Sequence, residues 1–191
     1  MKKGCLLPIV IIGGLLILAL IFIVPAIGYR NSLATMDEGI NNQWHEIDNQ
    51  LLRRSDLIPN LVNTVKGYAK HEKDVFTNLQ NARNQLLAAN TDAARVQAAG
   101  TFEGALNRLI MVTENYPNLK ADAEFIRLMD NLEGTENRLA VARKRYNDAV
   151  NEFNAKIRRF PGSLFAWGYK AHEYFEIPEM ARTTPQVDFN Q

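Results

Sequence analysis

The chain has 191 residues, with 22 basic and 21 acidic side chains and a formal net charge of +1. This near balance, without any block of basic residues, argues against a nucleic-acid-binding surface, so nucleic acid is not an expected partner. The single cysteine, Cys5, excludes an intrachain disulfide.

The first predicted element is a membrane-spanning helix. No charged side chain occurs from Leu6 to Ile27. At about 1.5 Å per helical residue, this run is long enough to cross the roughly 30 Å apolar core of a bilayer. It is too long for a cleaved secretory signal. Acylation of Cys5 would need an apolar region before the cysteine, where only Met-Lys-Lys-Gly stands. We therefore predict a retained single-pass anchor.

The flanking charges predict the orientation of this anchor. Lys2, Lys3 and the terminal amine precede the span, whereas Arg30 is the only basic residue that follows it until Arg53. Basic residues are retained on the cytoplasmic side of a membrane. We expect a cytoplasmic N-terminus in a bacterial cell membrane, with the remaining domain periplasmic or extracellular.

Apolar residues recur every three or four positions through most of the remaining chain, which is typical of amphipathic helices. The spacing predicts four helices, over residues 29–51, 58–86, 94–116 and 125–157. Ser55 or Asp56 is placed to cap the second helix, with Pro59 in its first turn. Thr91 or Asp92 is placed to cap the third.

The end signals of the fourth helix complete the predicted architecture. Asn118 is placed to cap this helix, and Pro161-Gly162 to end it. Short connections favour antiparallel neighbours. We predict an all-α fold, with an N-terminal transmembrane helix followed by an antiparallel up-and-down four-helix bundle that packs like a coiled coil. The predicted regions are an anchor (1–28), the bundle (29–160) and a partly ordered aromatic tail (161–191).

Three charged residues, Glu72, Glu136 and Arg143, interrupt the apolar stripes of the predicted helices. Charged groups at core positions usually pair with one another and can fix the register of the helices. A solvated edge of the bundle is the alternative.

The aromatic and basic residues of the tail have two interpretations, of which one is a contact with the membrane surface. Aromatic rings favour the headgroup zone and basic residues favour anionic lipid. The alternative is that the aromatic rings fold back onto the bundle as core. The candidate membrane-interface residues are Arg158, Arg159, Phe160, Phe165, Trp167 and Tyr169.

The sequence offers no recognisable catalytic or metal-binding motif. Each histidine precedes a glutamate, but His45, His71 and His172 are not followed by a second histidine at the spacing of a zinc protease. No glutamate stands three residues before a histidine, as a di-metal carboxylate bundle needs. Neither a nucleophile elbow nor a phosphate-binding glycine loop occurs. We predict no enzymatic activity, no metal and no cofactor.

Several motifs resemble the LemA family. The stretch from Arg53 to Glu72 is similar to the family signature, and the residues around Tyr29 fit the family pattern except for Arg30. The second half of the family pattern is matched by Tyr116-Pro-Asn-Leu-Lys-Ala, Leu132-Glu-Gly-Thr-Glu-Asn-Arg138, Tyr146-Asn and Phe153-Asn.

The resemblance implies a bacterial single-span membrane protein with an antiparallel helical bundle and without known catalytic activity or cofactor. Relatives have been linked to membrane organisation, including magnetosome formation, and to genomic neighbourhood with an HtpX-type membrane metalloprotease. The predicted function is a membrane-anchored scaffold or adaptor that acts through helix surfaces and self-association at the bacterial envelope. The alternatives are a membrane-remodelling oligomer acting on lipid and a regulator of such a protease. The expected partners are the bilayer, further copies of the chain and that protease.

The signature stretch supplies the candidate interaction surface, because its polar positions exceed what packing requires. The alternative is that these residues hold together a corner between the first and second helices. The candidates are Arg53, Arg54, Asp56, Asn60, Lys66, Tyr68 and Glu72.

Overall fold

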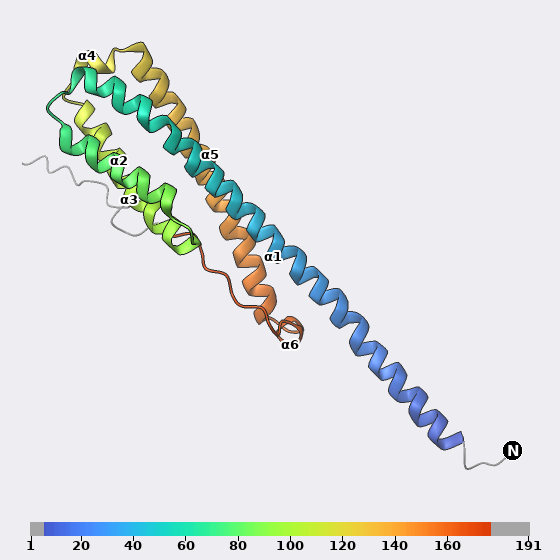
Figure 1. Ribbon diagram of the computed structural model, residues 1–191. Coiled ribbons are helices and arrows are strands. Elements are labelled where there is room, and N and C mark those ends of the chain that lie inside the picture. Colours follow the sequence, from blue (N-terminus) through green and yellow to red (C-terminus); the bar gives the residue numbers. More distant parts are fainter. Residues whose placement is uncertain (1–5, 177–191) are drawn as a thin grey trace, which may run out of the picture. The chain divides into compact units, whose positions relative to one another are not determined.

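The computed structural model describes residues 6–176, with side chains from residue 12 onward, and this part of the chain contains helices and no strand. The prediction of an all-α fold is therefore confirmed. In chain order (Figure 1), the helices are α1 (Leu6–Tyr68), α2 (Lys73–Ala88), α3 (Asp92–Thr113), α4 (Pro117–Lys120), α5 (Ala123–Arg158) and α6 (Gly162–Phe165). Lys2, Lys3, Cys5 and the end of the predicted tail, residues 177–191, lie outside the described residues.

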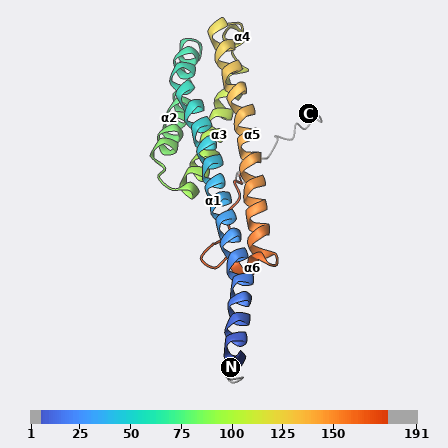
Figure 2. The ribbon, with the colours of Figure 1, turned by 90° about the vertical axis from the view of Figure 1, so that its right-hand side faces the viewer.

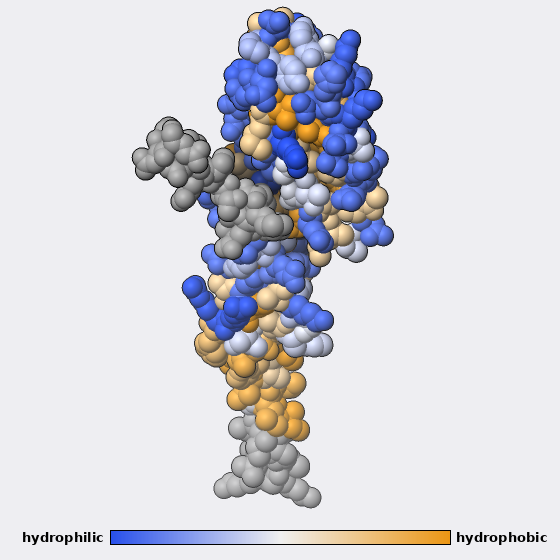
Figure 3. All heavy atoms as spheres, turned by 90° about the vertical axis from the view of Figure 1, so that its left-hand side faces the viewer, coloured by the Kyte–Doolittle hydropathy of each residue, from blue (hydrophilic) through white to orange (hydrophobic). Residues whose placement is uncertain are grey.

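Helix α1 begins with the predicted apolar segment. Its large apolar side chains from Ile12 to Ile27 are all more than half exposed. The most apolar window has a mean hydropathy of 2.5 with none of it buried, so the helix is long and apolar enough to cross a membrane. Figure 3 shows the apolar side chains gathered over this segment.

The predicted boundary between the first and second helices is wrong. Helix α1 continues through Ser55, Asp56 and Pro59 and ends only at Tyr68, so neither candidate cap acts as one. The second helix is α2, and the chain turns at residues 69–72. Glu72, which interrupted the apolar stripe, marks this turn.

Pro59 stays inside α1 because another side chain replaces its missing hydrogen bond. Proline has no N–H, so the carbonyl oxygen of Ser55, four residues earlier, lacks its usual helical donor. The Nε atom of Arg83 on α2 donates to this oxygen at 2.8 Å. Since Ser55 is fully buried, water would not substitute for this bond.

The described chain divides into two compact units. One contains the chain up to Asn42 together with Tyr146–Glu173, and the other contains Gln43–Arg145 and the chain from Tyr174 onward. Helices α1 and α5 contribute to both units. The three-region division predicted from the sequence stays a prediction.

Each unit has its own apolar core. In the first unit, Leu33 and Ile40 of α1 and Val150 and Phe153 of α5 are at most 1% exposed. In the second unit, α2 packs beside α3 (Figures 1 and 2). The fully or almost fully buried side chains of the second unit include Ile47, Leu51, Ile58, Leu61, Leu79, Leu86, Phe102, Leu106, Leu109 and Leu139.

The helix caps agree only in part with the sequence prediction. Thr91 caps α3, since its side chain accepts a hydrogen bond from the N–H of Ala94. Asn118 lies inside the short helix α4 and does not cap the next helix. Asp122 takes that role by accepting from the N–H groups of Glu124 and Phe125 at 2.9 and 3.0 Å.

The interaction at Pro59 predicts a coupled pair of substitutions. Arg83→Met should destabilise the full-length protein by about 1–3 kcal/mol, because it leaves a buried carbonyl without a donor. In a Pro59→Ala background, the new N–H satisfies that carbonyl and the same change should cost much less. Urea unfolding in detergent, followed by helical circular dichroism, measures both costs. Equal costs in the two backgrounds would contradict the assigned role of Arg83.

Candidate functional site

The structure separates the predicted interaction surface into exposed and buried residues, all of which lie in the second unit. Arg53, Asp56, Asn60 and Lys66 are exposed. Arg54 is only 5% exposed. A partner protein can therefore reach the first four side chains, whereas Arg54 has a role inside the fold.

Arg54 is the most buried member of an ion cluster that joins three helices. Its Nη1 atom lies 2.6 Å from Oε2 of Glu103 on α3 and also contacts the carboxylate of Glu136 on α5. Arg143 also lies on α5, about two helical turns after Glu136. Its Nη1 atom is 3.7 Å from Oε1 of Glu136. Two positive and two negative groups thus balance, and the two charges that interrupt the fourth apolar stripe are paired with each other.

Burial governs the electrostatics of this ion cluster. Loss of water raises the pKa of the Glu103 carboxyl, and the neighbouring charge of Arg54 opposes that rise. Loss of water also lowers the pKa of Arg143. The Nε atoms of Arg54 and Arg143 are buried without a hydrogen-bond acceptor among the described residues. The cluster is therefore costly to desolvate, and the two guanidinium groups compensate the two half-buried carboxylates.

Tyr68 and Glu72 tie two turns of the second unit together. The hydroxyl of Tyr68 donates to Oδ2 of Asp122 at 2.8 Å, and the hydroxyl of Tyr116 donates to Oε1 of Glu72 at 3.2 Å. The bond to Asp122 raises the pKa of Tyr68. The N–H of Phe125 and the Tyr68 hydroxyl lower the pKa of Asp122. These contacts fit the corner-holding interpretation, with the corner at residues 69–72.

The remaining exposed residues form a stripe along α1, which we call the α1 surface. Arg53, Asp56, Asn60, Asn63 and Gly67 follow one another at steps of three and four and are all exposed. Asn63 and Gly67 were not among the residues predicted from the sequence, although their spacing of three and four residues places them on the same helix face. The closest cation to Asp56 is Arg83, at 3.9 Å.

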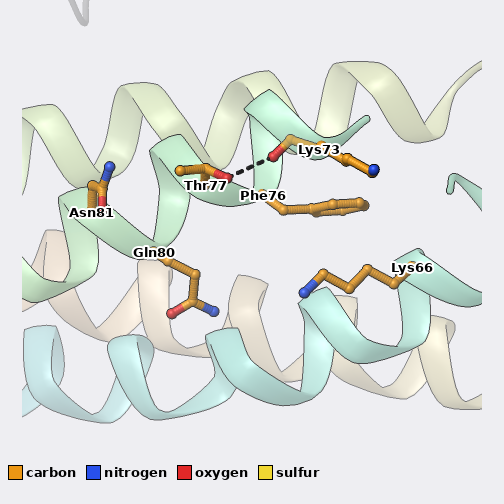
Figure 4. Close-up of a pocket in the computed structure, with 6 residues that line it drawn as sticks. All are labelled: Lys66, Lys73, Phe76, Thr77, Gln80 and Asn81. Carbon is orange, nitrogen blue, oxygen red and sulfur yellow. Dashed lines mark hydrogen bonds between the residues drawn. The ribbon is translucent and has the colours of Figure 1, made fainter. Parts of the chain in front are cut away.

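Lys66 lies beside the α1 surface, at a shallow pocket shared with α2 (Figure 4). Its ammonium group lies 5.6 Å from the ring centre of Phe76. The pocket has a volume of about 340 Å³. Its floor is fixed in part by Thr77, whose hydroxyl donates to the carbonyl of Lys73 at 2.9 Å. The pocket is lined by Lys66, Lys73, Phe76, Thr77, Gln80 and Asn81.

The predicted membrane-interface residues lie in the first unit, where part of the tail packs against α1. The ring centres of Phe165 and Tyr29 are 5.9 Å apart. The Tyr29 hydroxyl donates to the carbonyl of Lys156 at 3.3 Å, and the Lys156 ammonium donates to Ser32 at 2.6 Å. Gly162 is required at this junction, since a Cβ there would lie 2.0 Å from the Lys156 carbonyl oxygen.

Arg30 holds the segment after α6 to the same helix. Its guanidinium donates to the carbonyl of Trp167 at 3.1 Å. The same group lies 4.6 Å from the ring centre of Trp167 and 5.7 Å from that of Tyr169. Arg30 therefore fastens the tail to α1.

His172 makes the next attachment of the tail. Its Nε2 atom lies 2.6 Å from Oδ1 of Asp37, and its ring packs on Phe153. The side chain of Asn154 donates to the backbone carbonyl of His172 and accepts from its N–H, each at 2.9 Å. The ring of Phe153 also packs on Tyr169, with centres 5.8 Å apart.

The tail residues differ in exposure. Phe165 and Tyr169 are half-buried and pack on Tyr29 of α1 and Phe153 of α5. In contrast, Phe160, Leu164 and Trp167 are 81%, 61% and 74% exposed, and we call these three residues the α6 cluster. Arg158 and Arg159 are exposed just before it. Among the described residues, no group of three or more His, Cys, Asp or Glu side chains is placed to hold a metal ion.

The ion cluster predicts opposite outcomes for two adjacent arginines. Arg54→Gln should destabilise the full-length protein by about 3 kcal/mol, because it removes a buried guanidinium and leaves the half-buried carboxylates of Glu103 and Glu136 with one cation. Arg53→Gln should change the stability by no more than about 0.5 kcal/mol, because the side chain is exposed. Urea unfolding in detergent measures both. A comparable loss in the two variants would contradict the buried role of Arg54.

The same cluster predicts a pH dependence. The raised pKa of Glu103 means that the folded state binds this proton more tightly than the unfolded state does, so protonation of Glu103 favours folding. Removal of Arg54 raises that pKa further. The stability deficit of Arg54→Gln relative to the unmodified protein should therefore shrink as the pH falls from neutral toward about 4. A deficit that grows or stays constant over this range, in the same unfolding assay, would refute the assignment.

Comparison with known proteins identifies the family. The LemA family pattern matches residues 43–189, which include the stretch from Arg53 to Glu72. The chain is 26% identical to magnetosome protein MamQ 2 of Paramagnetospirillum magneticum, over 87% of this chain and 72% of the relative. It is 24% identical to magnetosome protein MamQ of Magnetospirillum gryphiswaldense, over 94% and 78% of the two chains. It is 23% identical to protein LemA of Metamycoplasma hominis, over 73% and 64%.

None of these names is that of an enzyme. The long apolar helix and the similarity to magnetosome proteins indicate association with a membrane. Because the family pattern covers most of the sequence, the chain belongs to the LemA family.

Proposed function

We propose that the protein is a membrane-anchored, non-enzymatic scaffold or adaptor of the bacterial envelope that binds protein partners through the α1 surface. The observation that carries the proposal is the continuity of α1 from its apolar segment to Tyr68. No non-helical linker separates the anchor from the α1 surface. A partner bound there is thereby attached to the membrane through a single helix.

The chemistry of the α1 surface supports contact with a helix. Arg53, Asp56, Asn60 and Asn63 offer one positive charge, one negative charge and two amides along one line. Such polar groups are typical of the accessible part of a non-obligate interface, not of a permanently buried one. Steps of three and four residues match the spacing at which a second helix lies along the first.

Self-association is part of this proposal. In a two-fold dimer the same patch meets itself, so a residue of one copy contacts a different residue of the other. Arg53 of one copy would then lie opposite Asp56 of another, with complementary charges. The weak contact of Asp56 with Arg83, at 3.9 Å and with the Asp56 side chain 74% exposed, leaves its carboxylate available for this pairing.

A second candidate function is membrane remodelling by an oligomer that acts directly on lipid. The observation that favours it is the exposure of the α6 cluster, because large apolar side chains in water mark a binding surface. It differs from the adaptor in requiring large, regular assemblies of the purified protein on liposomes. Regulation of an HtpX-type membrane metalloprotease stays a prediction from the family resemblance.

The adaptor proposal predicts a site-specific crosslink. A photo-crosslinking amino acid at Asn60 of the full-length protein, in native membranes, should give a discrete larger product. The same amino acid at Asn131, an exposed asparagine on α5, serves as the matched control and should give none. Immunoblotting against the protein detects the product.

Alanine substitutions provide the opposing outcome. Asn60→Ala combined with Lys66→Ala should reduce the crosslinked product formed from a photo-crosslinker at Asn63. If the double substitution leaves every product and assembly state intact, the α1 surface is not the contact site.

A further inference from the structure

We propose that the α6 cluster is a second membrane contact, which lies in the headgroup zone of the same bilayer that α1 crosses. Phe160, Leu164 and Trp167 would insert beside the end of the apolar segment. The tail would then bind the membrane directly, whatever partner the α1 surface binds.

Exposure is the first argument. Among the described residues of the first unit, all the large apolar side chains that are strongly exposed belong either to α1 between Ile12 and Ile27 or to the α6 cluster. The apolar segment is exposed because lipid covers it. The side chains of the α6 cluster are likewise apolar and exposed, and lipid would cover them in the same way.

Position is the second argument, because the α6 cluster lies next to the last residues of the apolar segment. Ile27 is the last strongly exposed apolar residue of this segment, and Tyr29 and Arg30 follow it. Tyr29 packs on Phe165 of α6, and Arg30 stacks on Trp167. Figure 2 shows α6 beside α1 at this level. Helix α6 and Trp167 therefore adjoin the end of the apolar segment.

The side-chain chemistry matches the headgroup zone. Tryptophan is enriched at membrane interfaces, where its ring is apolar and its N–H remains hydrated. Arg158 and Arg159 are exposed next to the cluster, and neither forms an ion pair within residues 6–176. Basic groups in this position attract anionic lipid headgroups.

The α6 cluster is held in place by the fold. Arg30 fastens the Trp167 backbone to α1, and the tight approach of Gly162 to the Lys156 carbonyl fixes the start of α6. The exposed side chains are therefore presented by a fixed backbone, which lowers the conformational entropy lost when they bind lipid.

Fluorescence quenching tests the proposal, because the two tryptophans can be observed one at a time. The full-length Trp44→Phe variant reports only Trp167. It is reconstituted in vesicles of phosphatidylcholine and phosphatidylglycerol whose acyl chains carry bromine near the headgroup. Trp167 emission should fall by about half or more relative to vesicles without bromine, as expected for an interfacial indole.

The matched control is the full-length Trp167→Phe variant, which reports only Trp44. Trp44 lies on α1 well beyond the apolar segment and packs on Phe175, so its emission should be unaffected by bromine. Circular dichroism checks that both variants keep the helical content of the unmodified protein.

A further variant tests whether Trp167 is close to the brominated lipid because the α6 cluster inserts, or only because α1 holds it near the bilayer. Phe160→Ser with Leu164→Ser, in the Trp44→Phe background, changes two exposed side chains and should reduce the quenching of Trp167. Three results would overturn the proposal. They are Trp167 emission that bromine does not change, quenching that the double serine variant retains in full, and blue-shifted Trp167 emission that depends on protein density but not on bromine. The last result would assign the cluster to a contact between copies of the chain.

Discussion

The hydrogen bond from Arg83 to the Ser55 carbonyl replaces the helical donor that Pro59 removes from α1. Proline inside a helix normally ends or kinks it, because the carbonyl four residues earlier loses its donor. Here a side chain from α2 supplies the donor, so α1 passes Pro59 and carries the stretch from Arg53 to Tyr68 on the same helix as the anchor.

The ion cluster of the second unit carries a desolvation penalty but can fix the register of the helices that it joins. Arg54, Glu103, Glu136 and Arg143 come from α1, α3 and α5 and neutralise one another. Apolar residues would pack with a smaller desolvation penalty, but they would tolerate a shift of one helix along another. A cluster in which each carboxylate needs a particular guanidinium penalises such a shift. We interpret it as the device that fixes the register of these helices.

The two candidate surfaces differ in chemistry, and we propose a different partner for each. The α1 surface is polar and evenly spaced, as expected for a contact with protein that forms and breaks. The α6 cluster is apolar and adjoins the anchor, as expected for a contact with lipid. An adaptor with both surfaces would bind a partner through one and maintain a second hold on the bilayer through the other.

The sequence by itself determined what depends on local chemistry. The charge-free run defined the apolar helix, the apolar spacing defined an all-α fold, and Thr91 marked the start of α3, because these signals act over a few residues. Only the tertiary structure decided where α1 ends, since the donor that replaces the Pro59 N–H comes from Arg83 on another helix. It also decided that Tyr169 packs on Phe153 while Trp167 is exposed. These two aromatic side chains lie outside the helices and differ in which distant groups they meet, and spacing along the chain carries no record of those groups.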